Sequence, residues 1–190
     1  MKVPLEIQLE KLAELGLSLD PAVGIEDLLD SYPREDLEEP AFNLLLAVLG
    51  FNVEREPYDQ PNCARAWNFD TECIYGTGDY VGIVNRLLQV AGKPENFFTE
   101  IADSIDFDSS EAWLQYRRGD GTLRNWEIEV KDDWVDQEVI TKVMGDIESD
   151  DSHFYSKDNG QAMVLYYLDD EAAEQLEDLA PGQISRVQSD

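Results

Sequence analysis

The sequence predicts a single α+β domain, with N-terminal helices packed on a mainly antiparallel sheet made by two C-terminal β-hairpins. Two observations carry this prediction. Apolar residues recur at helical spacing in the N-terminal half, whereas the C-terminal half contains two strand–turn–strand patterns. Hydrophobic residues make up 43% of the chain, which is enough for a packed core. The domain is predicted over residues 1–180, followed by a polar, frayed tail over residues 181–190.

The N-terminal half is predicted to be mostly helical. A first helix follows from four apolar residues at helical spacing and ends at Gly16: Leu5, Leu9, Leu12 and Ala13. Pro40 suits the first position of an apolar helix that ends before Gly50. Residues 66–74 alternate in part, which indicates a strand. The clearest helix has one continuous apolar stripe: Tyr80, Ile83, Val84, Leu87, Leu88 and Ala91.

Each predicted hairpin is followed by a helix. In the first hairpin, residues 111–118 and 122–131 flank a turn with two glycines, and Asp136 is a good N-cap for the helix that follows. In the second hairpin the turn contains Asn-Gly, and the strand over residues 162–168 is apolar on both faces, which is typical of a central strand. Asp169 is expected to cap the last helix.

The net charge restricts the partners. The chain has 42 Asp and Glu against 14 Lys and Arg, a formal charge of −28. Such a chain repels the phosphate backbone of nucleic acids and anionic membrane surfaces, so neither is expected as a partner. A basic protein is the partner that this field attracts. Solubility or a high-salt habitat would explain the same charge.

The sequence offers little for cofactor or metal chemistry. The N-terminus lacks the apolar run of a secretory signal, so we expect a cytoplasmic protein with Cys63 and Cys73 as reduced thiols. The two cysteines do not form a zinc pattern, and the single histidine, His153, excludes a site made of several histidines. No cofactor and no metal site are therefore predicted.

One short motif supports an enzymatic alternative. Glu129 and Lys131 form the Glu-x-Lys pattern of some metal-dependent nucleases, and alternation along a strand would place them on one face, opposite Trp126 and Ile128. Such a site needs a further carboxylate, for which the candidates are Asp106, Asp108 and Asp120. The same pattern also fits the hydrated face of an ordinary strand.

Two further acidic groups are candidate sites. The first is expected in a solvated loop between a helix and a strand, and it consists of Asp146, Glu148, Asp150 and Asp151. In the second, Asp132 and Asp133 adjoin Trp134, and acid beside an aromatic anchor is typical of a surface that binds a basic protein. The predicted partner-binding residues are therefore Asp132, Asp133 and Trp134, with Asp150 and Asp151 as neighbours.

Two segments, FDTECIYGTGDYV (Phe69 to Val81) and EAWLQYRRGDGTLRNWEIEVKDDWVD (Glu111 to Asp136), resemble parts of small acidic bacterial immunity proteins of polymorphic toxin systems. The resemblance covers about residues 10–145 and contains no catalytic motif. It implies a non-enzymatic protein that binds a basic cognate toxin and occludes its active site. The alternatives that stay open are a metal-dependent nuclease or hydrolase, and an acidic domain with a structural or housekeeping role.

Overall fold

The chain divides into two compact units, and the first is discontinuous in sequence. One unit holds Met1–Phe69 and Ser149–Val187, and the other holds Asp70–Glu148. The computed structural model describes residues 2–160 and 162–188. The single domain predicted over residues 1–180 stays a prediction, and each unit has a sheet of its own.

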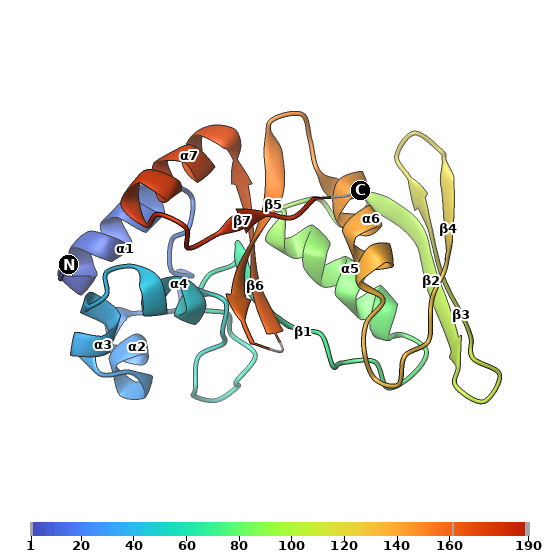
Figure 1. Cartoon of the computed structure of the whole chain (residues 1–190), viewed down its shortest axis with the longest axis horizontal. Coiled ribbons are helices and arrows are strands. Elements are labelled where there is room, and N and C mark those ends of the chain that lie inside the picture. The colour runs from blue at the N-terminus through green and yellow to red at the C-terminus, as the bar shows by residue number, and fades with distance from the viewer. Residues whose placement is uncertain (1, 161, 189–190) are drawn as a thin grey trace. The chain divides into compact units, whose positions relative to one another are not determined.

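The first unit combines helices with a four-stranded sheet (Figure 1). Its helices are α1 (Leu5–Glu14), α2 (Ile25–Ser31), α3 (Arg34–Glu38), α4 (Asn43–Leu49) and α7 (Asp170–Leu179). Its strands are β1 (Ala66–Asp70), β5 (Ser152–Asn159), β6 (Ala162–Asp169) and β7 (Ser185–Arg186). The sheet order is β1-β6-β5-β7, and β5 is antiparallel to both β6 and β7.

Strand β6 is the centre of the first unit. Five consecutive residues are buried, which confirms the prediction of a central strand: Val164, Leu165, Tyr166, Tyr167 and Leu168. Alternate members of this run join apolar residues of α1, α4 and α7 in one core cluster. The buried hydroxyl of Tyr166 donates to the Leu46 carbonyl oxygen in α4 at 2.7 Å. The strand therefore meets the helices through both apolar packing and a buried hydrogen bond.

In two places the first unit differs from the elements expected at residues 40–49 and after residue 180. Helix α4 begins at Asn43 and not at Pro40, because Phe42 has a left-handed φ of 65° that no α-helical residue adopts. The polar tail, predicted to fray from residue 181, contains β7, where Ser185 pairs with Ser156 and Arg186 with Tyr155. The pairing of this short strand with β5 satisfies backbone groups at that edge of the sheet.

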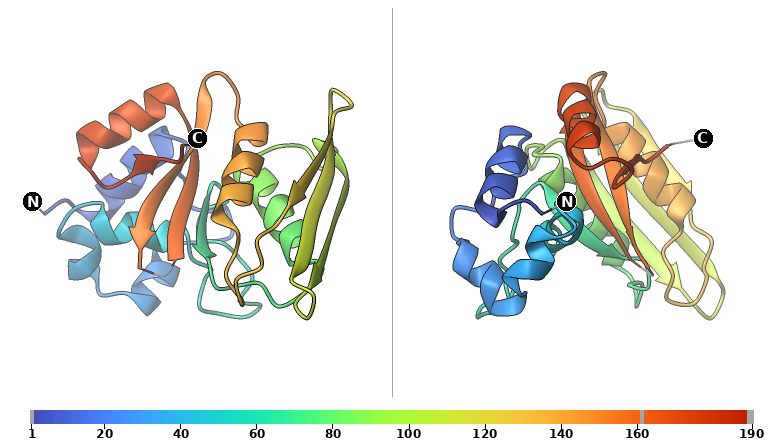
Figure 2. Two further views of the ribbon diagram at one scale, coloured as in Figure 1. Left: turned by 45° about the vertical axis from the view of Figure 1, so that its right-hand side comes forward. Right: turned by 60° about the vertical axis from the view of Figure 1, so that its left-hand side comes forward.

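The second unit is a three-stranded antiparallel sheet with two helices on one of its faces (Figures 1 and 2). The strands are β2 (Phe98–Asp106), β3 (Glu111–Arg118) and β4 (Leu123–Glu127), in that order. The helices are α5 (Asp79–Val90) and α6 (Gln137–Ile147). The inward residues of β3 are buried under these helices: Ala112, Leu114 and Tyr116. The alternate residues of β3 face away from the helices.

Strand β2 is an element of the second unit that the sequence pattern does not predict. Its buried Asp103 interrupts any apolar alternation, but the carboxylate accepts hydrogen bonds from the backbone N–H groups of Gly78 and Val81 at 2.6 and 3.1 Å. These groups belong to the start of α5, where a helix has N–H groups without helical partners. Asp103 therefore fixes α5 to the sheet, and its burial is compensated by hydrogen bonds.

The predicted α+β class is confirmed, with N-terminal helices and antiparallel hairpins in the C-terminal half. The two predicted hairpins, however, form separate sheets, one in each unit. Within residues 2–160 and 162–188, no helix combines the length and apolar character that a membrane span requires.

Candidate functional site

The predicted partner-binding residues Asp132, Asp133 and Trp134 lie in a tight turn of the second unit. Strand β4 ends at Glu127, earlier than the predicted end at Lys131. The chain then turns at Lys131–Trp134, where the Trp134 N–H donates to the Lys131 carbonyl oxygen at 2.9 Å. Asp132 has a φ of 48°, a left-handed conformation that aspartate tolerates better than most residues. The sequence therefore presents two carboxylates and an indole ring within a single turn.

Backbone hydrogen bonds hold this turn against the segment that precedes α5. The Ile74 N–H donates to the Asp133 carbonyl oxygen, and the Val135 N–H donates to the Thr71 carbonyl oxygen, both at 2.9 Å. Trp134 also forms an antiparallel bridge with Glu72. The turn is thus paired along its length, which limits the conformational entropy that a partner would remove on binding.

The helix that follows the turn begins as the sequence predicts. The Asp136 carboxylate accepts from the N–H groups of Glu138 and Val139 at 3.0 and 3.2 Å, which confirms it as the N-cap of α6. The Asp136 N–H donates to the hydroxyl oxygen of buried Tyr80 at 2.8 Å. Burial raises the pKa of Tyr80 to about 12, so the phenol is neutral at physiological pH. The carboxylate and the backbone N–H of Asp136 therefore both form hydrogen bonds that hold the start of α6.

The Asp132 and Asp133 carboxylates, unlike that of Asp136, do not cap a helix. Within the described residues, neither carboxylate forms an ion pair or a side-chain hydrogen bond, and Asp132 is exposed. Other acidic residues of the second unit serve as caps or close turns, as Asp103, Asp106 and Asp136 do. Two adjacent carboxylates without a structural role are available for an external cationic group.

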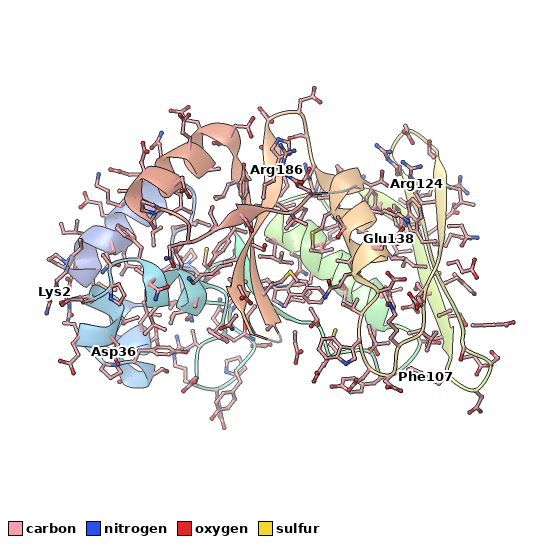
Figure 3. All side chains as sticks on the ribbon, in the orientation of Figure 1. Lys2, Asp36, Phe107, Arg124, Glu138 and Arg186 are labelled. Carbon is pink, nitrogen blue, oxygen red and sulfur yellow. The ribbon has the colours of Figure 1, made fainter. Side chains whose placement is uncertain are left out.

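Trp134 is partly exposed and has an aromatic neighbour. Its side chain is 38% exposed, and it lines a small surface pocket together with Phe107, which is 43% exposed and lies just beyond the end of β2 (Figure 3). The buried residues Tyr80 and Ile128 line the same pocket from the core side. We call Phe107, Asp132, Asp133 and Trp134 the Trp134 surface. It combines partly exposed aromatic area with an acidic rim.

The other two predicted partner-binding residues belong to the first unit. Asp150 and Asp151 lie in the turn before β5, and both are exposed. The Asp151 carboxylate accepts from the hydroxyl groups of Ser149 and Ser152 at 3.0 and 3.4 Å, so it has a local role in that turn. Asp132, Asp133 and Trp134 therefore belong to one unit, and Asp150 and Asp151 belong to the other.

The residues of the nuclease alternative have partners of their own. Glu129 and Lys131 form an exposed ion pair at 2.7 Å, which raises the pKa of the Lys131 ammonium group. The Asp106 carboxylate accepts from the N–H groups of Asp108 and Ser109. In the described part of the chain, no three or more His, Cys, Asp or Glu side chains are grouped so that they could hold a metal ion.

A buried polar network around Asp146 was not expected. Asp146 is predicted in a solvated loop, but it lies inside α6, and its side chain is only 9% exposed. Its carboxylate accepts from Arg118 at 2.9 Å, from Arg124 at 2.8 and 2.9 Å, and from the Tyr116 hydroxyl at 2.8 Å. The prediction for Asp146 is therefore wrong: the residue joins α6 to strands β3 and β4.

The ring of Trp126 completes this network. Its indole N–H donates to the Tyr116 hydroxyl oxygen at 3.1 Å, and the cationic groups of Arg124 and Lys142 lie 5.7 and 5.1 Å from its ring centre. Burial raises the pKa of Tyr116 above its ordinary value, and the Asp146 carboxylate raises the pKa of Arg124. One feature of the sequence points to this place: Asp146 follows Val139 and Val143 at helical spacing, i, i+4 and i+7.

Comparison with protein-family models, with curated proteins and with solved structures finds no match for this chain.

Proposed function

We propose that this protein is a non-enzymatic binding protein of the immunity type, which docks a basic protein, in particular a cognate toxin, onto the Trp134 surface. The observation that carries the proposal is the pair of carboxylates, Asp132 and Asp133, that directly precede a partly exposed tryptophan and have no partner among the described residues. Carboxylates in this state keep their full attraction for an incoming Lys or Arg side chain.

The charge of the second unit supports this proposal. Residues 70–148 contain 18 acidic and 7 basic side chains. Five of the basic side chains already pair with carboxylates of the same unit: Arg117, Arg118, Arg124, Lys131 and Lys142. The field around the unit is therefore strongly negative, which speeds the association of basic proteins and opposes contact with nucleic-acid phosphates.

The mechanism that we propose is occlusion. The Trp134 and Phe107 rings provide apolar area, and Asp132 and Asp133 neutralise cationic groups around the partner's functional cleft. The resemblance to immunity proteins supports a toxin as the partner, because such proteins neutralise a toxin by blocking its active site. No chemical step by this chain is needed, and no cofactor or metal takes part.

The decisive experiment measures the kinetics of association with a basic protein captured from the source cells. The test variant carries Asp132→Lys and Asp133→Lys. The control carries Glu35→Lys and Asp36→Lys on α3 of the first unit, so both variants change the net charge equally (Figure 3 labels Asp36). We expect the association rate to fall by tenfold or more in the test variant only, and its dependence on salt to flatten, since ions screen charges beyond about 8 Å.

Substitution of Trp134 separates an anchor from a merely structural residue. If the ring contacts the partner, Trp134→Ala raises the dissociation rate while the urea midpoint of the free protein changes little. The proposal fails if both charge-reversal variants behave alike, or if association is indifferent to salt. It also fails if Trp134→Ala lowers stability without changing dissociation.

A further inference from the structure

The three-stranded sheet has one face that the helices of its unit do not cover. Both α5 and α6 lie on the opposite face, as the left view of Figure 2 shows. The uncovered face presents the outward residues of β3 and β4: Glu111, Trp113, Gln115, Arg117, Leu123, Asn125 and Glu127. Trp113 is 39% exposed, although a tryptophan in a strand normally packs into a core.

Trp113 has two carboxylates as neighbours on this face. Glu127 is its direct partner across the β3–β4 pair, and Glu111 is two residues earlier on β3 and therefore on the same face. The Ile128 N–H donates to the Ala112 carbonyl oxygen, so the adjacent pair of Trp113 and Glu127 is of the non-hydrogen-bonded kind. Side chains in such pairs approach closely, with Cα atoms about 4.5 Å apart.

The three residues line a surface pocket of about 470 Å³. The pocket is also lined by Gln115 and Asn125, which lie directly opposite each other across the strand pair. A volume of this size accommodates a long side chain together with part of its backbone. Its wall therefore combines an indole ring, two carboxylates and two side-chain amides, all of which offer acceptors or a π-face to a cationic donor.

The carboxylates of the pocket have no partner within the described residues. Neither Glu111 nor Glu127 forms an ion pair or a side-chain hydrogen bond there. The single basic residue that points to this face from β3, Arg117, pairs with Glu100 at 2.8 Å. The positive charge available on the face is thus already neutralised, and the two glutamates remain as an unbalanced charge next to Trp113.

We propose that the Trp113 pocket binds an arginine side chain of a basic protein. A planar guanidinium group stacks on the indole ring, while its five N–H donors reach the Glu111 and Glu127 carboxylates and the amide oxygens beside them. A lysine ammonium group has a single charged centre and three donors, so it satisfies fewer of these acceptors. The inference adds a second contact to the binding function proposed above, and its test does not require the partner.

The test uses a small probe, N-acetyl-arginine N-methylamide, and the indole N–H signals of ¹⁵N-labelled protein. The chain has four tryptophans, and the Trp113→Phe variant identifies the signal of that residue. We expect the Trp113 signal to shift in a saturable manner with arginine and several-fold more weakly with the lysine analogue. The neutral citrulline analogue is expected to leave the signal in place.

Paired variants distinguish the pocket from general attraction to an acidic protein. Glu111→Gln with Glu127→Gln is expected to weaken arginine binding by about fivefold or more, because each exposed charge pair contributes about 2- to 5-fold. Glu95→Gln with Glu138→Gln removes the same charge from elsewhere in the second unit and is expected to leave the affinity within about twofold. Both variants retain the dispersed spectrum of a folded protein, since all four side chains are exposed.

The inference is overturned if arginine does not shift the Trp113 signal, if citrulline shifts it equally, or if both double variants weaken binding alike. Any of these results leaves the function proposed for the Trp134 surface intact, since Asp132 and Asp133 are unchanged throughout. Conversely, loss of a basic partner in the Asp132→Lys and Asp133→Lys variant does not affect the arginine titration.

Discussion

Replacement of Asp146 by alanine is expected to destabilise the protein more than any other single change of an acidic residue in α6. The carboxylate accepts four hydrogen bonds, three of them from guanidinium groups, and is 9% exposed. Without it, Arg118 and Arg124 lose their partner, and the buried hydroxyl of Tyr116 loses its acceptor. Removal of one partner from a buried charge network is costly because the remaining charges stay behind.

The magnitude follows from these contacts. A hydrogen bond to a charged group contributes about 1.5–3 kcal/mol, so four of them added without correction give about 6–12 kcal/mol. The two arginine side chains are 33% and 34% exposed, however, and they regain water when the carboxylate is lost. We therefore expect Asp146→Ala to lower the free energy of unfolding by about 2–4 kcal/mol.

Urea unfolding followed by circular dichroism tests this value. Glu138→Ala on the same helix is the matched control, because Glu138 is 78% exposed and its carboxylate forms an exposed ion pair with Lys142 one turn away. Its expected cost is at most about 0.5 kcal/mol. Equal costs for the two variants would refute the role of Asp146 as the link between α6 and the sheet. Asp146→Asn, which keeps the shape and loses the charge, should fall between them.

Three further predictions concern other parts of the chain. Gly50→Ala should lower the free energy of unfolding in urea by about 1–3 kcal/mol, because its new Cβ would lie 2.5 Å from a methyl carbon of Val164. Gly82→Ala, with open space at Cβ, should instead stabilise α5 by about 0.5–1 kcal/mol. Burial raises the pKa of Cys73 to about 11, so its alkylation rate at pH 8 should be well below that of a free thiol and should rise until about pH 11. Burial raises the pKa of Tyr80 to about 12 in the folded protein, so the folded state keeps a proton that the unfolded chain releases near pH 10. The free energy of unfolding should therefore fall as the pH rises from about 10 to 12. The fall should be less steep in Tyr80→Phe.

Local signals in the sequence predict the elements that local chemistry determines. Asp136 and Asp169 were expected as N-caps, and both carboxylates accept hydrogen bonds from the first turns of α6 and α7. The run over residues 162–168 was expected as a central strand because it is apolar on both faces, and β6 lies between β1 and β5. In each case the deciding interaction lies within a few residues or within the strand itself.

Elements that depend on distant partners could not be predicted in the same way. Strand β2 contains Asp103, whose burial is acceptable only because N–H groups more than 20 residues earlier bind it. Strand β7 consists of two exposed residues that need the edge of β5 to form a pair. Tertiary contacts of this kind leave no periodic pattern in the segment itself.

The candidate sites also differ in whether their residues are adjacent in the sequence or are brought together by the fold. Asp132, Asp133 and Trp134 are adjacent in sequence, so a turn that presents them together was foreseeable. The Trp113 pocket needs the register that places Glu127 opposite Trp113, and the network of Asp146 needs α6 to lie on the inward face of β3 and β4. Both depend on how strands and helices meet, which the spacing of residues along one segment does not encode.

The interruption of the first unit by the second has a consequence for synthesis on the ribosome. Helix α4 leaves the ribosome with its apolar residues Leu45 and Leu46, but β6, whose Tyr166 bonds to Leu46, is made only after all of residues 70–148. The second unit, in contrast, has its strands and helices in one uninterrupted stretch, and domains fold as units while the chain grows. Nascent chains from which residues 70–148 have emerged, while β6 is still inside the ribosome, should therefore hold a folded second unit and an N-terminal segment that still exposes apolar helices to chaperones.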